Sequence, residues 1–130
     1  MTLSPEDRQA VIDYRIERSL AAFKEAQYVA KGYFWNLTAN RLYYAVFYMC
    51  EALLLSNQIT TSSHAGVSRM MSLHFVRTGK LQKEEGELLG RLFRMRQTGD
   101  YDDLSDWTED EIMPLFPKVE ELIHKIKSLV

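Results

Sequence analysis

The chain has 130 residues, of which 46% are hydrophobic and 26% charged, and its formal net charge is −2. These values fit one globular domain over residues 1–130, with enough apolar residues for a core that needs no disulfide. The single cysteine, Cys50, excludes an intramolecular disulfide, and its place in an apolar stretch indicates a small buried residue in a reducing cytoplasm.

Neither a signal peptide nor a membrane span is expected. The N-terminal residues are polar and acidic, and they lack the basic start and apolar centre of a signal peptide. The apolar run from Leu42 to Leu55 is interrupted by Glu51 and is shorter than the roughly 20 residues that a membrane span needs. We therefore expect a soluble, cytoplasmic protein without membrane contact.

The first predicted helix runs from Pro5 to Lys31. Ser4 suits the capping position before it, and proline suits the first helical position. Apolar residues then recur three or four positions apart, as in a helix with one buried face. Gly32 follows and predicts the end of the helix.

The second predicted helix, from Asn36 to Asn57, is apolar on nearly all sides. A helix of this kind must be wrapped by other helices, so we expect it at the centre of the fold. At helical spacing, Arg41 reaches Tyr44 within one polar strip. That strip consists of Asn40, Arg41, Tyr44, Tyr48 and Glu51.

A short third helix is predicted to begin at His64, after a cap at Ser62 or Ser63. It ends at a turn over Arg77–Lys80. The fourth helix is predicted over Lys83–Gln97, where apolar residues again recur at helical spacing.

Thr98–Gly99 is expected to break the fourth helix, and Asp100–Trp107 then forms a loop. The last helix opens with a capping box at Thr108–Glu111, and Pro114 and Pro117 make its first turns irregular. Strand alternation is missing from the sequence. The fold class is therefore predicted to be all-α, an up-and-down antiparallel helical bundle of four main helices plus one short helix.

Charges are distributed unevenly along the chain. The segment Arg69–Arg96 holds seven cations and three anions, whereas Asp100–Glu111 holds seven anions and no cation. Two interpretations stay open. Either the basic and acidic faces pair within the fold or across a dimer, or the basic segment faces a polyanion.

Few catalytic motifs are visible. The sequence has no Gly-rich phosphate loop, zinc-ligand spacing or nucleophile elbow. The acidic run Asp100–Asp106 lacks the central glycine and final glutamate of a calcium loop, so we predict no metal and no cofactor.

Two motifs led by arginine remain. Four residues separate Arg69 from His74, and Arg96 is followed by Asp100 and Tyr101. Arginine binds phosphate with a planar fork, and histidine or aspartate can move a proton. These groups suffice in principle to cleave RNA through its 2′-hydroxyl, although this spacing of arginine and histidine occurs by chance in many proteins.

Four motifs in a fixed order resemble a known family. They are NRLYYAVF at 40–47, SHAGV at 63–67, FVRTG at 75–79 and RMRQTGDYD at 94–102. Together they cover nearly the whole chain and resemble the HEPN domain (higher eukaryotes and prokaryotes nucleotide-binding), in its small stand-alone prokaryotic branch. The resemblance implies a helical bundle that is often a homodimer and is frequently partnered with a minimal nucleotidyltransferase in toxin–antitoxin-like pairs.

Many members of that family are metal-independent ribonucleases. The resemblance implies an arginine and a histidine with four to six residues between them, near the end of a late helix and paired across a dimer. Arg96 matches this arginine, and Asp100 stands where the histidine is expected. His74 has the required spacing from Arg69, but it lies in the short third helix.

Three hypotheses follow. The first is a nucleotide- or RNA-binding module with weak or no catalysis, whose cleft is formed by Arg41, Tyr44, His64, Arg96, Asp100 and Tyr101. The second is a ribonuclease toxin in which Arg96 holds the phosphate and Asp100 or His64 handles the proton. The third is a structural or adaptor bundle in which Arg41 pairs with Asp100 or Glu51, because a buried cation needs a partner.

Overall fold

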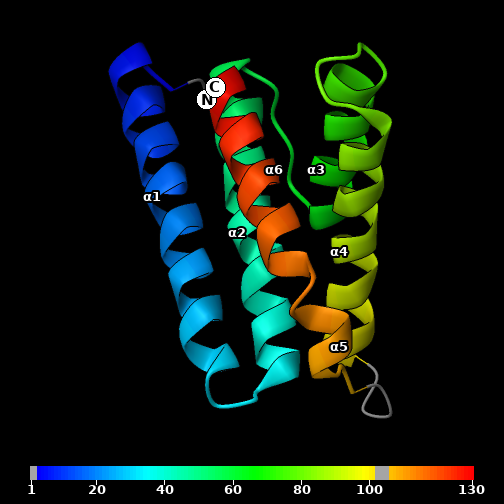
Figure 1. Cartoon of the computed structure of the whole chain (residues 1–130). Coiled ribbons are helices and arrows are strands. Elements are labelled where there is room, and N and C mark those ends of the chain that lie inside the picture. The colour runs from blue at the N-terminus through cyan, green and yellow to red at the C-terminus, as the bar shows by residue number, and fades with distance from the viewer. Residues whose placement is uncertain (1–2, 102–105) are drawn as a thin grey trace.

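Four long helices run alternately up and down through the protein (Figure 1). The structure, a computed structural model, describes residues 3–101 and 106–130, and of residues 98–101 it describes the backbone alone. The long helices are α1 (Pro5–Ala30), α2 (Trp35–Ser56), α4 (Lys83–Tyr101) and α6 (Leu115–Leu129). Shorter elements are α3 (His64–Met71), the π-helical turn η1 (Ser72–Val76) and α5 (Glu109–Ile112). The predicted all-α bundle is confirmed.

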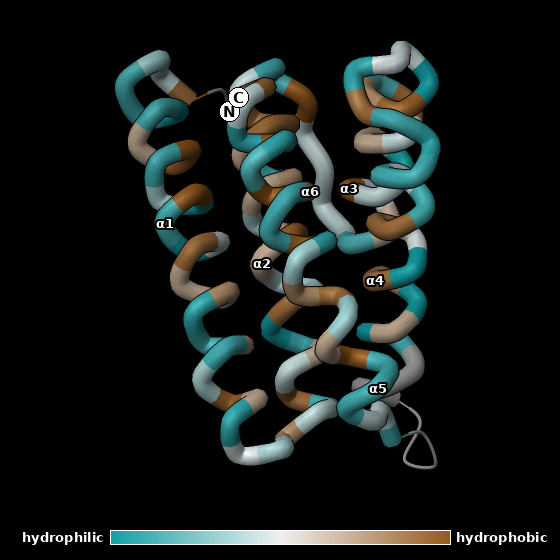
Figure 2. The backbone as a smooth tube through the Cα atoms, in the orientation of Figure 1, coloured by the Kyte–Doolittle hydropathy of each residue, from teal (hydrophilic) through white to brown (hydrophobic). Residues whose placement is uncertain are grey.

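The core is built around α2, as its apolar sequence predicts. Leu42, Met49 and Leu53 are fully buried, and α2 contacts α1, α3, α4, α5 and α6. The outer helices are amphipathic in the expected way. Along α1, hydrophobic segments recur on the side toward α2 (Figure 2). Burying a large apolar side chain contributes about 1.5–3 kcal/mol, so α2 supplies much of the driving force for folding.

The predicted helix starts are confirmed. Ser4 Oγ accepts the amide of Asp7 at 3.1 Å, and Ser63 Oγ accepts the amide of Gly66 at 2.9 Å. Thr108 and Glu111 form the predicted capping box before α5. Each cap satisfies amides that have no partner inside the helix, and so fixes where the helix begins.

The prolines interrupt the C-terminal helix where the sequence indicates. α5 ends at Ile112 and α6 begins at Leu115, with Pro114 between them. Pro114 and Pro117 have no amide hydrogen, so two hydrogen bonds of a continuous helix cannot form here. The chain therefore turns at Pro114 before α6 returns along α2.

The fourth helix is longer than predicted. α4 continues through Thr98 and Gly99 to Tyr101, so the expected break at Thr98–Gly99 is wrong. A helical glycine costs about 1 kcal/mol relative to alanine, which is too little to end a helix whose backbone bonding continues. Asp100 and Tyr101 are therefore the last residues of a helix and not the first of a loop.

The segment after α3 includes an unpredicted π-helical turn. In η1, the amide of Arg77 donates to the carbonyl of Ser72 at 2.9 Å, five residues earlier. The following turn over Arg77–Lys80 agrees with the sequence, and Gly79 adopts a left-handed φ of 81° there. After the π-helical turn η1, Arg77 lines a groove together with Arg69 of α3.

Within residues 3–101 and 106–130, no helix combines the length and apolar character needed to cross a membrane.

The end of α2 yields a test of backbone strain. Gln58 has a left-handed φ of 57°, and the amides of Gln58 and Ile59 donate to the carbonyls of Leu55 and Leu54 at 2.9 Å. Glycine usually occupies such a position, because it has no Cβ. We expect Gln58→Gly to exceed the control Gln58→Ala by about 1 kcal/mol in free energy of unfolding, measured by urea denaturation. Equal stability of the two variants would contradict this.

Candidate functional site

Charged and tyrosine side chains line the boundary between α1 and α2 and continue to α4. We call this set the polar seam; it consists of Arg15, Arg18, Glu25, Arg41, Tyr44, Tyr48, Glu51 and Arg96. Its α2 members are three or four residues apart and therefore share one face of the helix. Near the middle, the guanidinium of Arg18 lies 5.5 Å from the ring centroid of Tyr48.

Ion pairs join α2 to α1 on either side of this contact. Arg41 Nη1 lies 3.2 Å from Glu25 Oε1, and Arg15 Nε lies 3.7 Å from Glu51 Oε1. The predicted pairing of Arg41 with Glu51 is therefore wrong. The two residues are nearly three turns apart on one helix, roughly 15 Å, so each pairs with a residue of α1 instead.

Tyr44 lies between two arginines that come from different helices. The Cζ atom of Arg41, one turn earlier in α2, is 5.1 Å from the Tyr44 ring centroid. Arg96 on α4 places Nη2 3.5 Å from the Tyr44 hydroxyl oxygen, and all three side chains are partly exposed. Arg41 also donates to Asn40 Oδ1 at 2.8 and 3.1 Å, which orients its guanidinium. Two cations at one accessible ring favour an anionic ligand.

His64 reaches this site from the first position of α3. The cap at Ser63 fixes the first turn of α3 and hence the position of the imidazole. The imidazole stacks on the Phe47 ring with 4.3 Å between centroids, and its Nδ1 lies 2.7 Å from the Tyr43 hydroxyl oxygen. Burial raises the pKa of Tyr43, so the hydroxyl keeps its proton at neutral pH and can donate to Nδ1.

Tyr43 connects His64 to Arg96. The Cζ atom of Arg96 lies 5.9 Å from the Tyr43 ring centroid, and the rings of Tyr43 and Tyr44 meet edge to face at 5.1 Å. Tyr43 is not among the site residues predicted from the sequence. The signal was its hydroxyl, because a tyrosine at a core position needs a hydrogen-bond partner.

The structure thus gathers Arg41, Tyr43, His64 and Arg96 around Tyr44. The side chains of the other two predicted site residues, Asp100 and Tyr101, lie outside the described residues, and their roles stay predictions. The alternative motif does not share this environment: Arg69 and His74 are exposed on α3 and η1.

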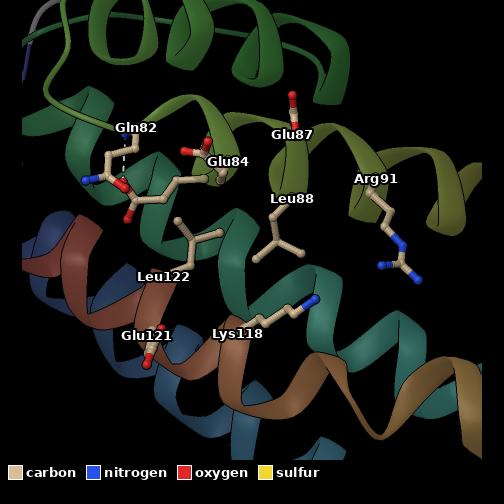
Figure 3. Close-up of a pocket in the computed structure, with 9 residues that line it drawn as sticks. Gln82, Glu84, Glu87, Leu88, Arg91, Lys118, Glu121 and Leu122 are labelled. Atoms are coloured by element: carbon tan, nitrogen blue, oxygen red, sulfur yellow. Dashed lines mark hydrogen bonds between the residues drawn. The ribbon is translucent and has the colours of Figure 1, made fainter.

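A groove of about 520 Å³ between α4 and α6 has a different character (Figure 3). Leu88 and Leu122 point toward one another across it. Its charged lining is Glu84, Glu85, Glu87 and Glu121 with Arg91 and Lys118, an excess of two negative charges. Such a lining repels phosphate. Among the described residues, no group of three or more His, Cys, Asp or Glu side chains is arranged to hold a metal ion.

Comparison with known proteins agrees with this architecture. The family model described as the HEPN domain matches residues 12–129. The chain belongs to the HEPN domain family. The resemblance seen in the sequence motifs is confirmed.

Several relatives match this HEPN domain along most of their length. A UPF0332 protein of Thermotoga maritima is 33% identical over 124 residues, which cover 95% of this chain and 94% of that protein. Two proteins of Methanocaldococcus jannaschii, both named as candidate toxins, are each 30% identical. One match covers 87% of this chain and 77% of the relative, and the other covers 95% and 88%.

Glu51 predicts a pH dependence of stability for the HEPN domain. Burial raises the pKa of its carboxyl above the ordinary 4.5, and Arg15 opposes the rise. The folded state therefore holds this proton more tightly than the unfolded chain, and stability falls as pH rises through this range. We expect Glu51→Gln to be more stable than wild type at neutral pH, with the difference closing as pH falls toward 4.5, in urea denaturation.

Glu25→Gln is the matched control, since it removes one negative charge from an exposed position of the same polar seam. A wild type that is more stable than Glu51→Gln at neutral pH would show that the ion pair with Arg15 outweighs the cost of burying the carboxylate.

Proposed function

We propose that this HEPN domain binds the phosphate groups of RNA or a nucleotide at Arg41 and Arg96, with weak or no catalysis of its own. The observation that carries the proposal is the convergence of both guanidinium groups on Tyr44. A guanidinium fork matches phosphate oxygens, and the partly exposed rings of Tyr44 and Tyr48 offer faces on which a base can stack.

The ion pair of Arg41 with Glu25 does not block this role. The Glu25 side chain is 50% exposed, and exposed ion pairs contribute about 0–1 kcal/mol. The terminal phosphate of a nucleotide carries more charge than a carboxylate, and a phosphodiester of RNA carries the same single charge; either can displace Glu25 at small cost. His64 and Tyr101 complete the predicted binding residues, with His64 fixed beside Tyr43.

The aspartate at position 100 supports weak catalysis. Arg96 and Asp100 are the residues predicted for any catalytic step, and the family resemblance implies a histidine where Asp100 stands. An ionised carboxylate repels a phosphodiester and has no proton to give to a leaving oxygen. Binding by Arg96 survives such a replacement better than cleavage does.

We further infer that the domain is a homodimer in the cytoplasm and forms a toxin–antitoxin-like pair with a minimal nucleotidyltransferase. Family membership supports this inference, because the family resemblance implies both associations. Two relatives that are named as candidate toxins also support it.

Titration with adenosine monophosphate, followed by heteronuclear NMR, tests the proposed site. We expect the amide resonances of Arg41, Tyr44 and Arg96 to shift. Arg41→Gln and Arg96→Gln should each weaken binding about tenfold, because each removes a charge-assisted hydrogen bond. Arg91→Gln, which removes an exposed arginine on the α6 side of α4, is the matched control. Shifts at other residues, or full binding by both variants of the site, would contradict the proposal.

A metal-independent ribonuclease is the second candidate, favoured by the hydrogen bond between Tyr43 and His64. In that case the Nδ1–H of His64 donates to the Tyr43 hydroxyl oxygen, so Nε2 can take the proton of the 2′-hydroxyl and return it to the leaving 5′ oxygen. Arg96 stabilises the charge on the phosphate.

Incubation with total RNA and a metal chelator distinguishes the two candidates. The primary proposal predicts RNA that stays intact. Cleavage by the wild type that is lost in both Arg96→Ala and His64→Ala would establish the ribonuclease. Intact RNA together with no binding of nucleotide would leave the adaptor bundle as the explanation.

A further inference from the structure

A second groove, of about 500 Å³, lies between the α3–η1 segment and α4. The residues that matter here are Ala65, Ser68, Arg69, Ser72, Arg77 and Phe93. Its volume is in the range of sites that take a small ligand or a segment of a chain. Arg69 and Arg77 are both exposed, and the π-helical turn η1 brings Arg77 to the same groove as Arg69.

The electrostatics of this groove are simple. Neither of the two ion pairs among the described residues involves Arg69 or Arg77, and none of the described side chains that line the groove is acidic. The nearest acid is Glu87, which lines an adjoining pocket that shares Ser68 and Ser72 with this groove and also holds Lys83 and Arg94. Glu84 and Glu121 line the groove between α4 and α6 (Figure 3). Helix α4 thus separates an acidic groove from a basic one, and the basic one attracts polyanions.

Two residues of the basic groove, Ala65 and Phe93, neighbour the candidate site. Ala65, in its lining, is the residue after His64. Phe93 also lines it, and its ring lies 6.3 Å from the ring of Tyr43. Phe93 is therefore a wall shared by the groove and the site.

We propose that the ligand is a single-stranded RNA chain, whose phosphodiester backbone continues from Arg96 along this groove to Arg69 and Arg77. This inference rests on the proposed function, which supplies the first phosphate contact. Arg69 and Arg77 neutralise phosphates, the hydroxyls of Ser68 and Ser72 donate to phosphate oxygens, and Phe93 gives an apolar surface for a base. A mononucleotide occupies only the site at Arg41 and Arg96. Binding of a mononucleotide and of an RNA chain can therefore be compared to distinguish the two sites.

Fluorescence anisotropy with a labelled RNA of about 12 nucleotides tests the groove. We expect the double variant Arg69→Gln/Arg77→Gln to bind this RNA at least about tenfold more weakly at low salt. The slope of log affinity against log salt should fall by about 1.4, since each lost phosphate contact removes about 0.7 for single strands. Adenosine monophosphate should bind the variant as it binds wild type.

The matched control is Arg91→Gln/Lys118→Gln, which removes the same charge from the groove between α4 and α6. All four substituted side chains are exposed, so both variants should fold, and circular dichroism checks this. An equal loss of RNA binding in the control would show that the loss depends only on net charge, and it would overturn the proposal that RNA binds in this groove. Displacement of the RNA by a short polyglutamate peptide at equal concentration would assign the groove to an acidic protein and overturn the RNA assignment.

The proposal for the groove and the proposal for the site at Arg41 and Arg96 can be refuted independently. Loss of RNA binding in Arg41→Gln and Arg96→Gln, with full binding by Arg69→Gln/Arg77→Gln, would overturn the groove and leave the proposed function standing. The reverse pattern would support the groove as an RNA surface and overturn the site at Arg41 and Arg96. Failure of the wild type to bind the RNA at low salt would overturn the groove as well.

Discussion

The burial of α2 constrains everything else in this fold. Its apolar residues face the surrounding helices on nearly all sides, and Leu42, Met49 and Leu53 are fully buried. Polar side chains on such a helix have little choice of location. They either lie where two covering helices leave access to solvent, or they are buried without a partner and destabilise the folded state. Arg41 and Glu51 therefore lie at the boundary with α1, where Glu25 and Arg15 meet them. The core and the candidate site follow from the same constraint.

The polar seam is positive although the chain as a whole is negative. Four arginines, Arg15, Arg18, Arg41 and Arg96, meet two glutamates, Glu25 and Glu51, among its described side chains. Aromatic rings help to hold this excess, because a cation over a ring face is stabilised without a carboxylate. Tyr44 and Tyr48 provide such rings and add no negative charge. A ligand that brings negative charge therefore meets guanidinium groups that lie beside ring faces as well as beside carboxylates.

Local chemistry made most of the fold predictable. The caps at Ser4 and Ser63, the box at Thr108 and the interruption at Pro114 each depend on a few adjacent residues, and each is where the sequence indicates. The break expected at Gly99 is wrong because the low helix propensity of one glycine is weaker than the backbone hydrogen bonds that continue α4. The residues of the site could be identified from the sequence more readily than the contacts between them. Arg41 and Tyr44 are one turn apart and were linked from spacing, whereas the partner Glu25 lies on another helix, and no pattern within α2 indicates it.

Helix α3 contributes residues to both the candidate site and the basic groove. The cap at Ser63 sets the first turn, which orients His64 toward Tyr43. The same eight-residue helix carries Arg69 on a different face, and η1 then returns Arg77 to that face. A helix this short is held by its cap and by the packing of Val67 and Met71, since two turns have little stability of their own. Any displacement of α3 therefore moves His64 and Arg69 together, so a chain bound along the groove also bears on the imidazole beside Tyr43.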